Sequence, residues 1–189
     1  MPTIDLDRYR VPRPQRADAA RNFDAILRAA RQVFTQDGPG APLEDIADRA
    51  GVGIATLYRN FASRQVLIEN VYLTEVQCVL AGAAASMRLP PWDGLTSWLR
   101  HFIDYLASKQ AIATAIDPGS ALFSACRTAL SQAGQPLIRR AQASGDLRTD
   151  ISDDDLSRYI FGAAAMSFAS AQQRHKLLNV LFDGLRART

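Results

Sequence analysis

The chain has 189 residues, of which 48% are apolar and 22% are charged, and its formal net charge is +3. This length allows one large domain or two small ones, and the apolar content is ample for a packed core, which excludes disorder as the default interpretation. A net charge that is only mildly positive does not by itself establish a nucleic-acid partner.

Several protein classes are disfavoured by simple patterns. No run of 18 or more apolar residues is present, so we expect no membrane-spanning helix and no membrane partner. The N-terminal residues lack the apolar segment of a signal peptide. Cys78 and Cys126 lack metal-ligand spacing and suit reduced thiols better than a disulfide framework. We therefore expect a cytoplasmic protein.

Residues 1–16 are expected to form a mobile basic arm, because they are polar and contain prolines that precede the first helical pattern. Their charges are Arg8, Arg10, Arg13 and Arg16 against Asp5 and Asp7. The first helix is expected from Asp18 to Asp37, since apolar residues follow the i, i+3, i+4 spacing there and the segment GPGAP (38–42) is rich in helix breakers.

Two short helices are expected next. The segment LEDIADRA (43–50) places Leu43, Ile46, Ala47 and Ala50 on one face, and Gly51 follows where a left-handed C-cap glycine is expected. A second short helix at about 54–60 should follow, because Leu57 and Phe61 repeat at i, i+4. Two short helices joined by a turn of this kind make a helix-turn-helix.

The remainder predicts further helices and no convincing strand. A long helix is expected from residue 64 to about 87, followed by helices near 92–107, 109–115, 118–143, 152–171 and 174–187. Ser152 with the acids Asp153, Asp154 and Asp155 is expected to cap a helix N-terminus. The expected fold is therefore all-α: a helix-turn-helix domain at residues 17–63, joined by a long helix to a larger helical body at 64–189.

The outward face of the second short helix suggests a function. If Leu57 and Phe61 face inward, the exposed side chains are small, hydrogen-bonding, aromatic and cationic: Ala55, Thr56, Tyr58, Arg59 and Asn60. Such a surface fits a major groove of DNA and its flanking phosphates. An ordinary helical corner in an all-α protein would show the same spacing, so spacing alone leaves both interpretations open.

Residues 18–73 resemble the N-terminal domain of the TetR (tetracycline-repressor-like) family of bacterial transcription regulators. The matching segments are ILRAARQVFTQDG and LEDIADRAGVGIATLYRNFASRQVLIENVY. The family signature is approximately IAxxAGVSxGTLYxHFxxKxxL, and this chain keeps Ile46, Ala47, Ala50, Gly51, Val52, Thr56, Leu57, Tyr58, Phe61 and Leu67. The match is contiguous and specific, and it favours DNA binding.

The resemblance implies DNA contacts from Gly53, Ile54, Ala55, Thr56, Tyr58, Arg59, Asn60 and Arg64. Thr56 and Tyr58 would contact phosphates or base edges, and Arg64 stands where the family has a phosphate-pairing lysine. Two positions depart from the family pattern. Gly53 replaces a Ser/Thr cap, which weakens that helix start, and Asn60 replaces a histidine. Ile54 and Ala55 offer no hydrogen bonds and can read only thymine methyls or DNA shape.

The resemblance also implies a homodimer that packs through the last two long helices. The segment FGAAAMSFA (161–169) agrees, since it is very apolar for a solvated helix, although ordinary core would also explain it. A dimer would place two recognition helices in successive major grooves of a palindromic operator, about 34–36 Å apart. The expected interface residues are Tyr159, Ile160, Ala163, Ala164, Phe168, Leu178, Leu181 and Phe182.

A small-molecule pocket inside the helical body is a further implication of the resemblance, with an apolar or aromatic effector. The candidate lining residues are Met87, Trp98, His101, Phe102, Tyr105, Phe123 and Cys126. Trp98, Phe102 and Tyr105 share a helical face, as either a cavity wall or a core would require. His101 and Asp104 could begin a metal site, but no second histidine lies near them, so we expect no metal and no cofactor.

The favoured hypothesis is a small-molecule-responsive transcriptional regulator, most simply a repressor, that binds double-stranded operator DNA as a homodimer. One alternative is a helical ligand-binding protein or enzyme without a DNA function. The sequence contains no G-x-S-x-G, phosphate loop, H-E-x-x-H or Cys/His cluster, so we do not expect an enzyme. A second alternative is a DNA-binding regulator that responds to no ligand.

Overall fold

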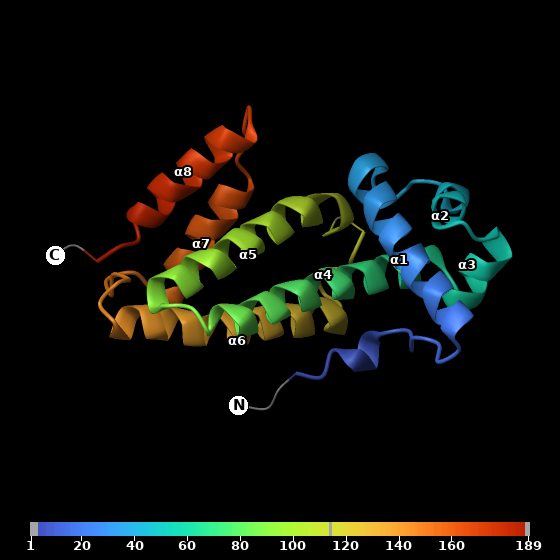
Figure 1. Ribbon diagram of the computed structural model, residues 1–189, viewed down its shortest axis with the longest axis horizontal. Coiled ribbons are helices and arrows are strands. Elements are labelled where there is room, and N and C mark those ends of the chain that lie inside the picture. Colours follow the sequence, from blue (N-terminus) through green and yellow to red (C-terminus); the bar gives the residue numbers. More distant parts are fainter. Residues whose placement is uncertain (1–3, 114, 188–189) are drawn as a thin grey trace. The chain divides into compact units, whose positions relative to one another are not determined.

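The computed structural model describes residues 4–113 and 115–187, and over these residues the chain forms eight α-helices, one short 3-10 helix and no named strand (Figure 1). The elements in chain order are η1 (Asp7–Tyr9), α1 (Ala17–Asp37), α2 (Leu43–Ala50), α3 (Ile54–Asn60), α4 (Arg64–Ser86), α5 (Pro91–Ala113), α6 (Ala121–Ala143), α7 (Asp153–Ala164) and α8 (Ala171–Asp183). The expected all-α fold is confirmed.

The helix boundaries after α4 correct the sequence-based expectation. One helix, α5, spans most of the two helices expected at 92–107 and 109–115, because no helix breaker separates them; residue 114 lies outside the described residues. The helix expected over 152–171 ends at Ala164. A new helix begins after Ser170, whose hydroxyl accepts a hydrogen bond from the Gln173 N–H at 3.1 Å. The Gln173 side chain in turn accepts from the Ala169 N–H at 2.6 Å.

The chain divides into two compact units. One consists of Met1–Gln77 and Ser108–Thr128, and the other of Cys78–Ala107 and Ala129–Thr189. Three helices, α4, α5 and α6, each contribute to both units. Since these units are defined by contacts in space, the expected division of the chain into residues 1–16, 17–63 and 64–189 remains a prediction.

In the first unit, α1, α2 and α3 pack on one another (Figure 1). Their shared core is formed by large apolar side chains that are at most 5% exposed: Phe23, Ile26, Phe34, Ile46, Leu57 and Phe61. Burying an aliphatic or aromatic side chain of this size contributes about 1.5–3 kcal/mol relative to leaving it exposed. Apolar burial therefore holds the three helices together.

The long helix α4 is the one described helix that is long and apolar enough to cross a membrane by length and composition. Half of the segment concerned is buried inside the protein. Leu67, Leu73 and Val76 are fully buried there. An ion pair of 2.6 Å also joins the Glu75 carboxylate to Arg31 of α1. We interpret α4 as a core helix for these reasons.

Residues 4–16 contact the rest of the first unit, while residues 1–3 lie outside the described residues, and the expected mobility of the arm remains a prediction. Leu6 is only 5% exposed, and the Val11 N–H donates to Oδ1 of the buried Asn70 at 3.0 Å. Arg10 donates to the hydroxyl of Thr74 at 3.1 Å. The arm lies against α4 because it supplies an apolar side chain to the core and satisfies a buried amide.

A bidentate ion pair attaches the end of the same segment to α1. Arg13 donates to both carboxylate oxygens of Asp24, at 2.9 and 2.7 Å. The hydrogen bond and charge of Arg13 lower the pKa of Asp24 below its ordinary value. Two of the four arginines of this segment, Arg10 and Arg13, therefore form polar contacts within the protein.

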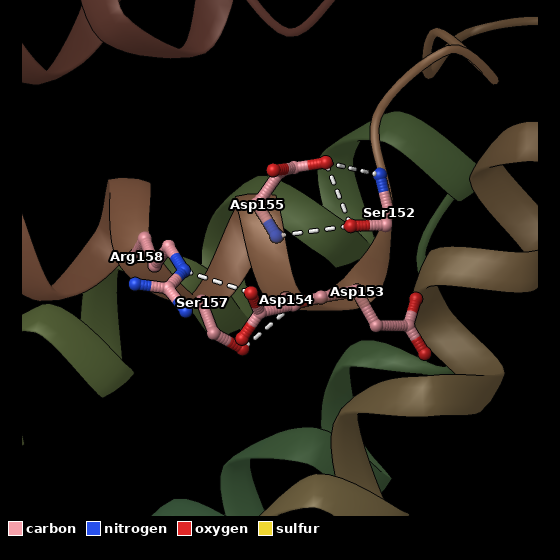
Figure 2. A network of polar contacts seen from close by, with 6 residues as sticks. All are labelled: Ser152, Asp153, Asp154, Asp155, Ser157 and Arg158. Carbon is pink, nitrogen blue, oxygen red and sulfur yellow. Dashed lines mark hydrogen bonds and ion pairs between the residues drawn. The ribbon is translucent and has the colours of Figure 1, made fainter.

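In the second unit, a capping box begins α7 as the sequence predicted (Figure 2). Ser152 Oγ accepts from the Asp155 N–H at 3.2 Å, and Asp155 Oδ2 accepts from the Ser152 N–H at 2.9 Å. The Ser152 hydroxyl also donates to Asp155 Oδ2 at 2.6 Å, and this bond together with the one from the Ser152 N–H lowers the pKa of Asp155.

The helices α5 and α6 approach each other closely, so that a Cβ on Gly134 would come within 2.4 Å of the Trp98 ring. Glycine is therefore required there for the indole to fit.

Candidate nucleic-acid interface

The turn between α2 and α3 has the geometry that its glycine predicts. Gly51 has φ +68° and ψ +31°, in the left-handed region, and its N–H donates to the Asp48 carbonyl at 3.1 Å. The Val52 N–H donates to the Ala47 carbonyl at 3.0 Å. These bonds satisfy the last carbonyl groups of α2 and redirect the chain into α3 within three residues.

The inward and outward faces of α3 match the expectation. Leu57 and Phe61 are 0% exposed, whereas Tyr58 is 48% exposed. Gly53, Ala55 and Arg59 are also exposed, and Ile54, Thr56 and Asn60 are half-buried. Apolar burial thus fixes one face of the helix and leaves the hydrogen-bonding and cationic side chains at the surface.

Side chains on the outward face are organised by bonds within α3. Arg59 Nε donates to the Ala55 carbonyl at 3.2 Å, and its Nη2 donates to the Thr56 hydroxyl at 3.3 Å. Asn60 Nδ2 donates to the Thr56 carbonyl at 2.8 Å. Each of these bonds uses only part of the donor capacity, since arginine has five N–H groups and asparagine two. The remaining donors of both residues can face a partner.

The start of α3 carries the weak cap that the sequence predicted. Gly53 is the N-cap residue, and no side chain caps the helix there. The Thr56 N–H bonds instead to the Gly53 carbonyl at 2.8 Å. Since a serine or threonine at this position would add a side-chain acceptor, α3 depends more heavily on the burial of Leu57 and Phe61.

The side chain of Arg64 forms contacts that the sequence did not indicate. Its Nη1 donates to the Pro39 carbonyl at 3.1 Å and also to the Ala41 carbonyl. Both acceptors belong to the loop that precedes α2. The guanidinium is part-buried, so the side chain expected to pair with a phosphate is engaged with this loop.

The candidate pocket residues fall in both units. In the second unit, the Trp98 and Phe102 rings stack with centroids 5.2 Å apart, and Phe102 and Tyr105 stack at 6.1 Å. Met87 and His101 are exposed. Asp104, weighed as a metal ligand with His101, forms an ion pair with Arg174. In the first unit, Phe123 stacks on Tyr72 at 6.4 Å and Cys126 is buried.

The expected dimer residues differ in their exposure, and their role in a dimer remains a prediction. Five of the eight are at most 8% exposed and therefore pack within the unit itself: Ile160, Ala163, Ala164, Leu178 and Phe182. Tyr159 is 40% exposed, and its hydroxyl donates to the Leu181 carbonyl at 2.9 Å. Phe168 lies in the segment between α7 and α8. The large apolar side chains exposed on these two helices are instead Phe161, Leu177 and Val180, in addition to Tyr159.

Sequence periodicity did not select Phe161, Leu177 and Val180, and the reason is physical. Both α7 and α8 carry apolar side chains on opposite faces, and spacing alone does not tell which face the chain covers itself. Phe161, at 55% exposed, and Val180, at 62%, are the clearest cases. Large apolar side chains left exposed on two helices suit a surface for another molecule.

Two family models match the chain. Residues 26–71 match the model of bacterial regulatory proteins of the tetR family. Residues 90–187 match the C-terminal domain of SbtR-like transcriptional regulators, which is more than half of the chain. No curated protein matches the sequence.

Solved structures of regulators are similar to the chain over nearly its full length. A TetR transcriptional regulator from Streptomyces coelicolor is 37% identical, with a TM-score of 0.74, over 88% of this chain and 99% of its own. A TetR transcription regulatory protein from Mycobacterium vanbaalenii is 28% identical, with a TM-score of 0.72, over 92% and 100%. The ketosteroid transcriptional regulator of Mycobacterium tuberculosis, at 17% identity and a TM-score of 0.65 over 95% and 100%, shares the fold alone.

Proposed function

The chain belongs to the TetR family of transcriptional regulators, as its sequence resemblance predicted, and from this premise we propose that it is a cytoplasmic repressor that binds a palindromic operator as a homodimer. The observation that carries the proposal is the outward face of α3. There Thr56, Tyr58 and Arg59 lie at the surface of a helix whose other face is buried. Like regulators of this family in general, the protein would act by binding and not by catalysis.

Some contacts of α3 would position the protein on the DNA backbone, and others would read the bases. The hydroxyls of Thr56 and Tyr58 and the free donors of Arg59 and Asn60 suit phosphates and base edges. Ile54 and Ala55 supply only apolar contact, which can recognise thymine methyls. Because few side chains on α3 can form base-specific hydrogen bonds, DNA shape would contribute to the specificity.

Dimerisation would use the apolar side chains that α7 and α8 leave exposed, namely Tyr159, Phe161, Leu177 and Val180. A second copy of the chain would remove these side chains from water, which is the main driving force of permanent interfaces. The two copies would then present two α3 helices to the two halves of the operator. The residues buried within each copy, such as Ile160 and Phe182, would support this surface from behind.

An apolar or aromatic effector is the proposed ligand of the second unit. The Trp98, Phe102 and Tyr105 rings stack in sequence along α5, and the buried Trp98 Nε1 has no hydrogen-bond partner among the described residues. A buried N–H without a partner costs about 1–3 kcal/mol, so an acceptor on a ligand would offset that cost. Effector binding would then shift the protein between states of different DNA affinity.

The function is tested by titrating the protein against the DNA upstream of its own gene and against random DNA of equal length. The affinity for the upstream fragment should exceed that for random DNA by a factor of about 10³ or more, and both affinities should fall as the salt concentration rises. Equal affinity for both fragments would favour the alternative of a helical ligand-binding protein without a DNA function.

A further inference from the structure

One side chain joins the two ends of the helix-turn-helix. Arg64 is the first residue of α4 and follows α3 closely, whereas Pro39 and Ala41 precede α2. Arg64 Nη1 donates to both carbonyl groups, to Pro39 at 3.1 Å and to Ala41 as well. The two acceptors are 25 and 23 residues away along the chain. The guanidinium therefore closes the segment that contains α2, the turn and α3.

In the loop on which Arg64 acts, Ala41 is only 5% exposed, whereas Gly38 and Pro39 are half-buried and Gly40 is exposed. Gly38 has φ +83°, and a Cβ at Gly38 or Gly40 would find no atom within 4 Å. Within the loop, the Ala41 N–H donates to the Gly38 carbonyl at 3.2 Å, and no side chain caps α2 at Pro42. Two glycines in a segment this short give its backbone many accessible conformations. The position of the loop therefore depends on the burial of Ala41 and on the hydrogen bonds that hold its backbone.

We infer that Arg64 is a positioning residue for DNA recognition, which holds the loop at residues 39–41 and not a DNA phosphate. The inference rests on the proposed DNA-binding function. The loop leads directly into α2, and α2 packs against α3, so a displaced loop would displace the recognition helix. A charged donor shared between two carbonyl oxygens forms stronger bonds than a neutral donor would.

Salt dependence of binding separates this role from a direct phosphate contact. Log K falls as log salt concentration rises, and removing one phosphate contact reduces the steepness of this fall, here called the slope, by about 0.9. For Arg64→Ala we expect an affinity for the upstream DNA that is about tenfold weaker, with the slope unchanged. Arg59→Ala is the matched control, since Arg59 is exposed on α3, and it should lower both the affinity and the slope.

A second variant tests whether the loop carries the effect. Gly40→Ala fits the structure, because the space around Gly40 is open and its φ is not in the left-handed region. Alanine restricts the backbone, so it should recover part of the affinity lost in Arg64→Ala while leaving wild-type binding nearly unchanged. A methyl group cannot replace a phosphate contact, so rescue is expected only if Arg64 acts on the loop.

Circular dichroism of each variant shows whether it is folded at the assay temperature. If Arg64→Ala is unfolded at the assay temperature, Arg64→Gln is titrated instead, because glutamine keeps an N–H donor but loses the charge. An unchanged slope together with rescue by Gly40→Ala supports the inference. A slope lowered by about 0.9 in the Arg64 variant, or no rescue, overturns it while wild-type binding persists. Wild-type protein without salt-dependent binding overturns the proposed function instead.

Discussion

The rings of Phe23 in α1 and Phe61 at the end of α3 lie 4.9 Å apart between centroids, with an angle of 31° between their planes. Phe61 is fully buried and is the C-cap residue of α3, where its N–H donates to the Leu57 carbonyl at 2.8 Å. The contact fixes the end of the recognition helix to α1. Apolar packing therefore determines where the DNA-facing residues lie.

Replacing Phe61 should strongly destabilise the protein. Phe61→Ala would leave a cavity between α1 and α3, and such truncations cost about 3–5 kcal/mol. Urea denaturation followed by circular dichroism measures the change in the free energy of unfolding. Tyr58→Ala is the matched control, because this neighbouring aromatic side chain is 48% exposed and its loss should cost little. Equal destabilisation by the two variants would refute the assigned inward face of α3.

The partly buried carboxyl group of Glu75 should make stability depend on pH. Burial raises the pKa of Glu75 above its ordinary value, and the charge of Arg31 only partly opposes this effect. The folded protein therefore holds the Glu75 proton more tightly than the unfolded chain does. Stability contributed by the neutral acid is present below pH 4.5 and is lost as the pH rises through the raised pKa.

Two variants check this sign. Glu75→Gln should be more stable relative to the wild type near neutral pH than at about pH 4, because glutamine cannot ionise. Arg31→Ala should show the opposite trend, since it removes the charge that lowers the pKa of Glu75. Thermal unfolding at both pH values gives the comparison. A relative stability of Glu75→Gln that decreases towards neutral pH would show that the ion pair outweighs desolvation.

The local features of the fold could be predicted from the sequence because short-range chemistry determines them. Gly51 allows the left-handed turn, and Leu57 with Phe61 anchors α3, as the spacing indicated. The capping box at Ser152 was predictable for the same reason. Contacts between distant residues were not predictable. The carbonyl partners of Arg64 lie 23 and 25 residues away, and no periodic signal connects them.

The sequence also did not reveal which apolar side chains lie at the surface. Ile160 and Phe161 are adjacent and apolar, yet the first is 1% exposed and the second 55%. Helical spacing places them on different faces but does not reveal which face another element of the chain covers. Packing of α7 and α8 within the second unit decides this, and the dimer assignment changed for that reason.

Dimerisation through the exposed face predicts the effect of Val180→Glu. A carboxylate in the centre of an apolar interface would lose its hydration, so the dimer should dissociate at concentrations where the wild-type dimer persists. Sedimentation velocity over a range of concentrations measures the change. Ser131→Glu is the control, because it introduces the same carboxylate at an exposed position of α6. A Val180→Glu dimer as stable as that of the control would exclude this face as the interface.

If the outward face of α3 reads the operator, the loss of its hydroxyl groups should show in titrations of Thr56→Ala and Tyr58→Ala against the upstream DNA. We expect operator binding to be nearly abolished in both variants, while sedimentation shows the same dimer as the wild type. The claim would be contradicted by variants that bind the operator with wild-type affinity, or by variants that lose binding only because they dissociate into monomers.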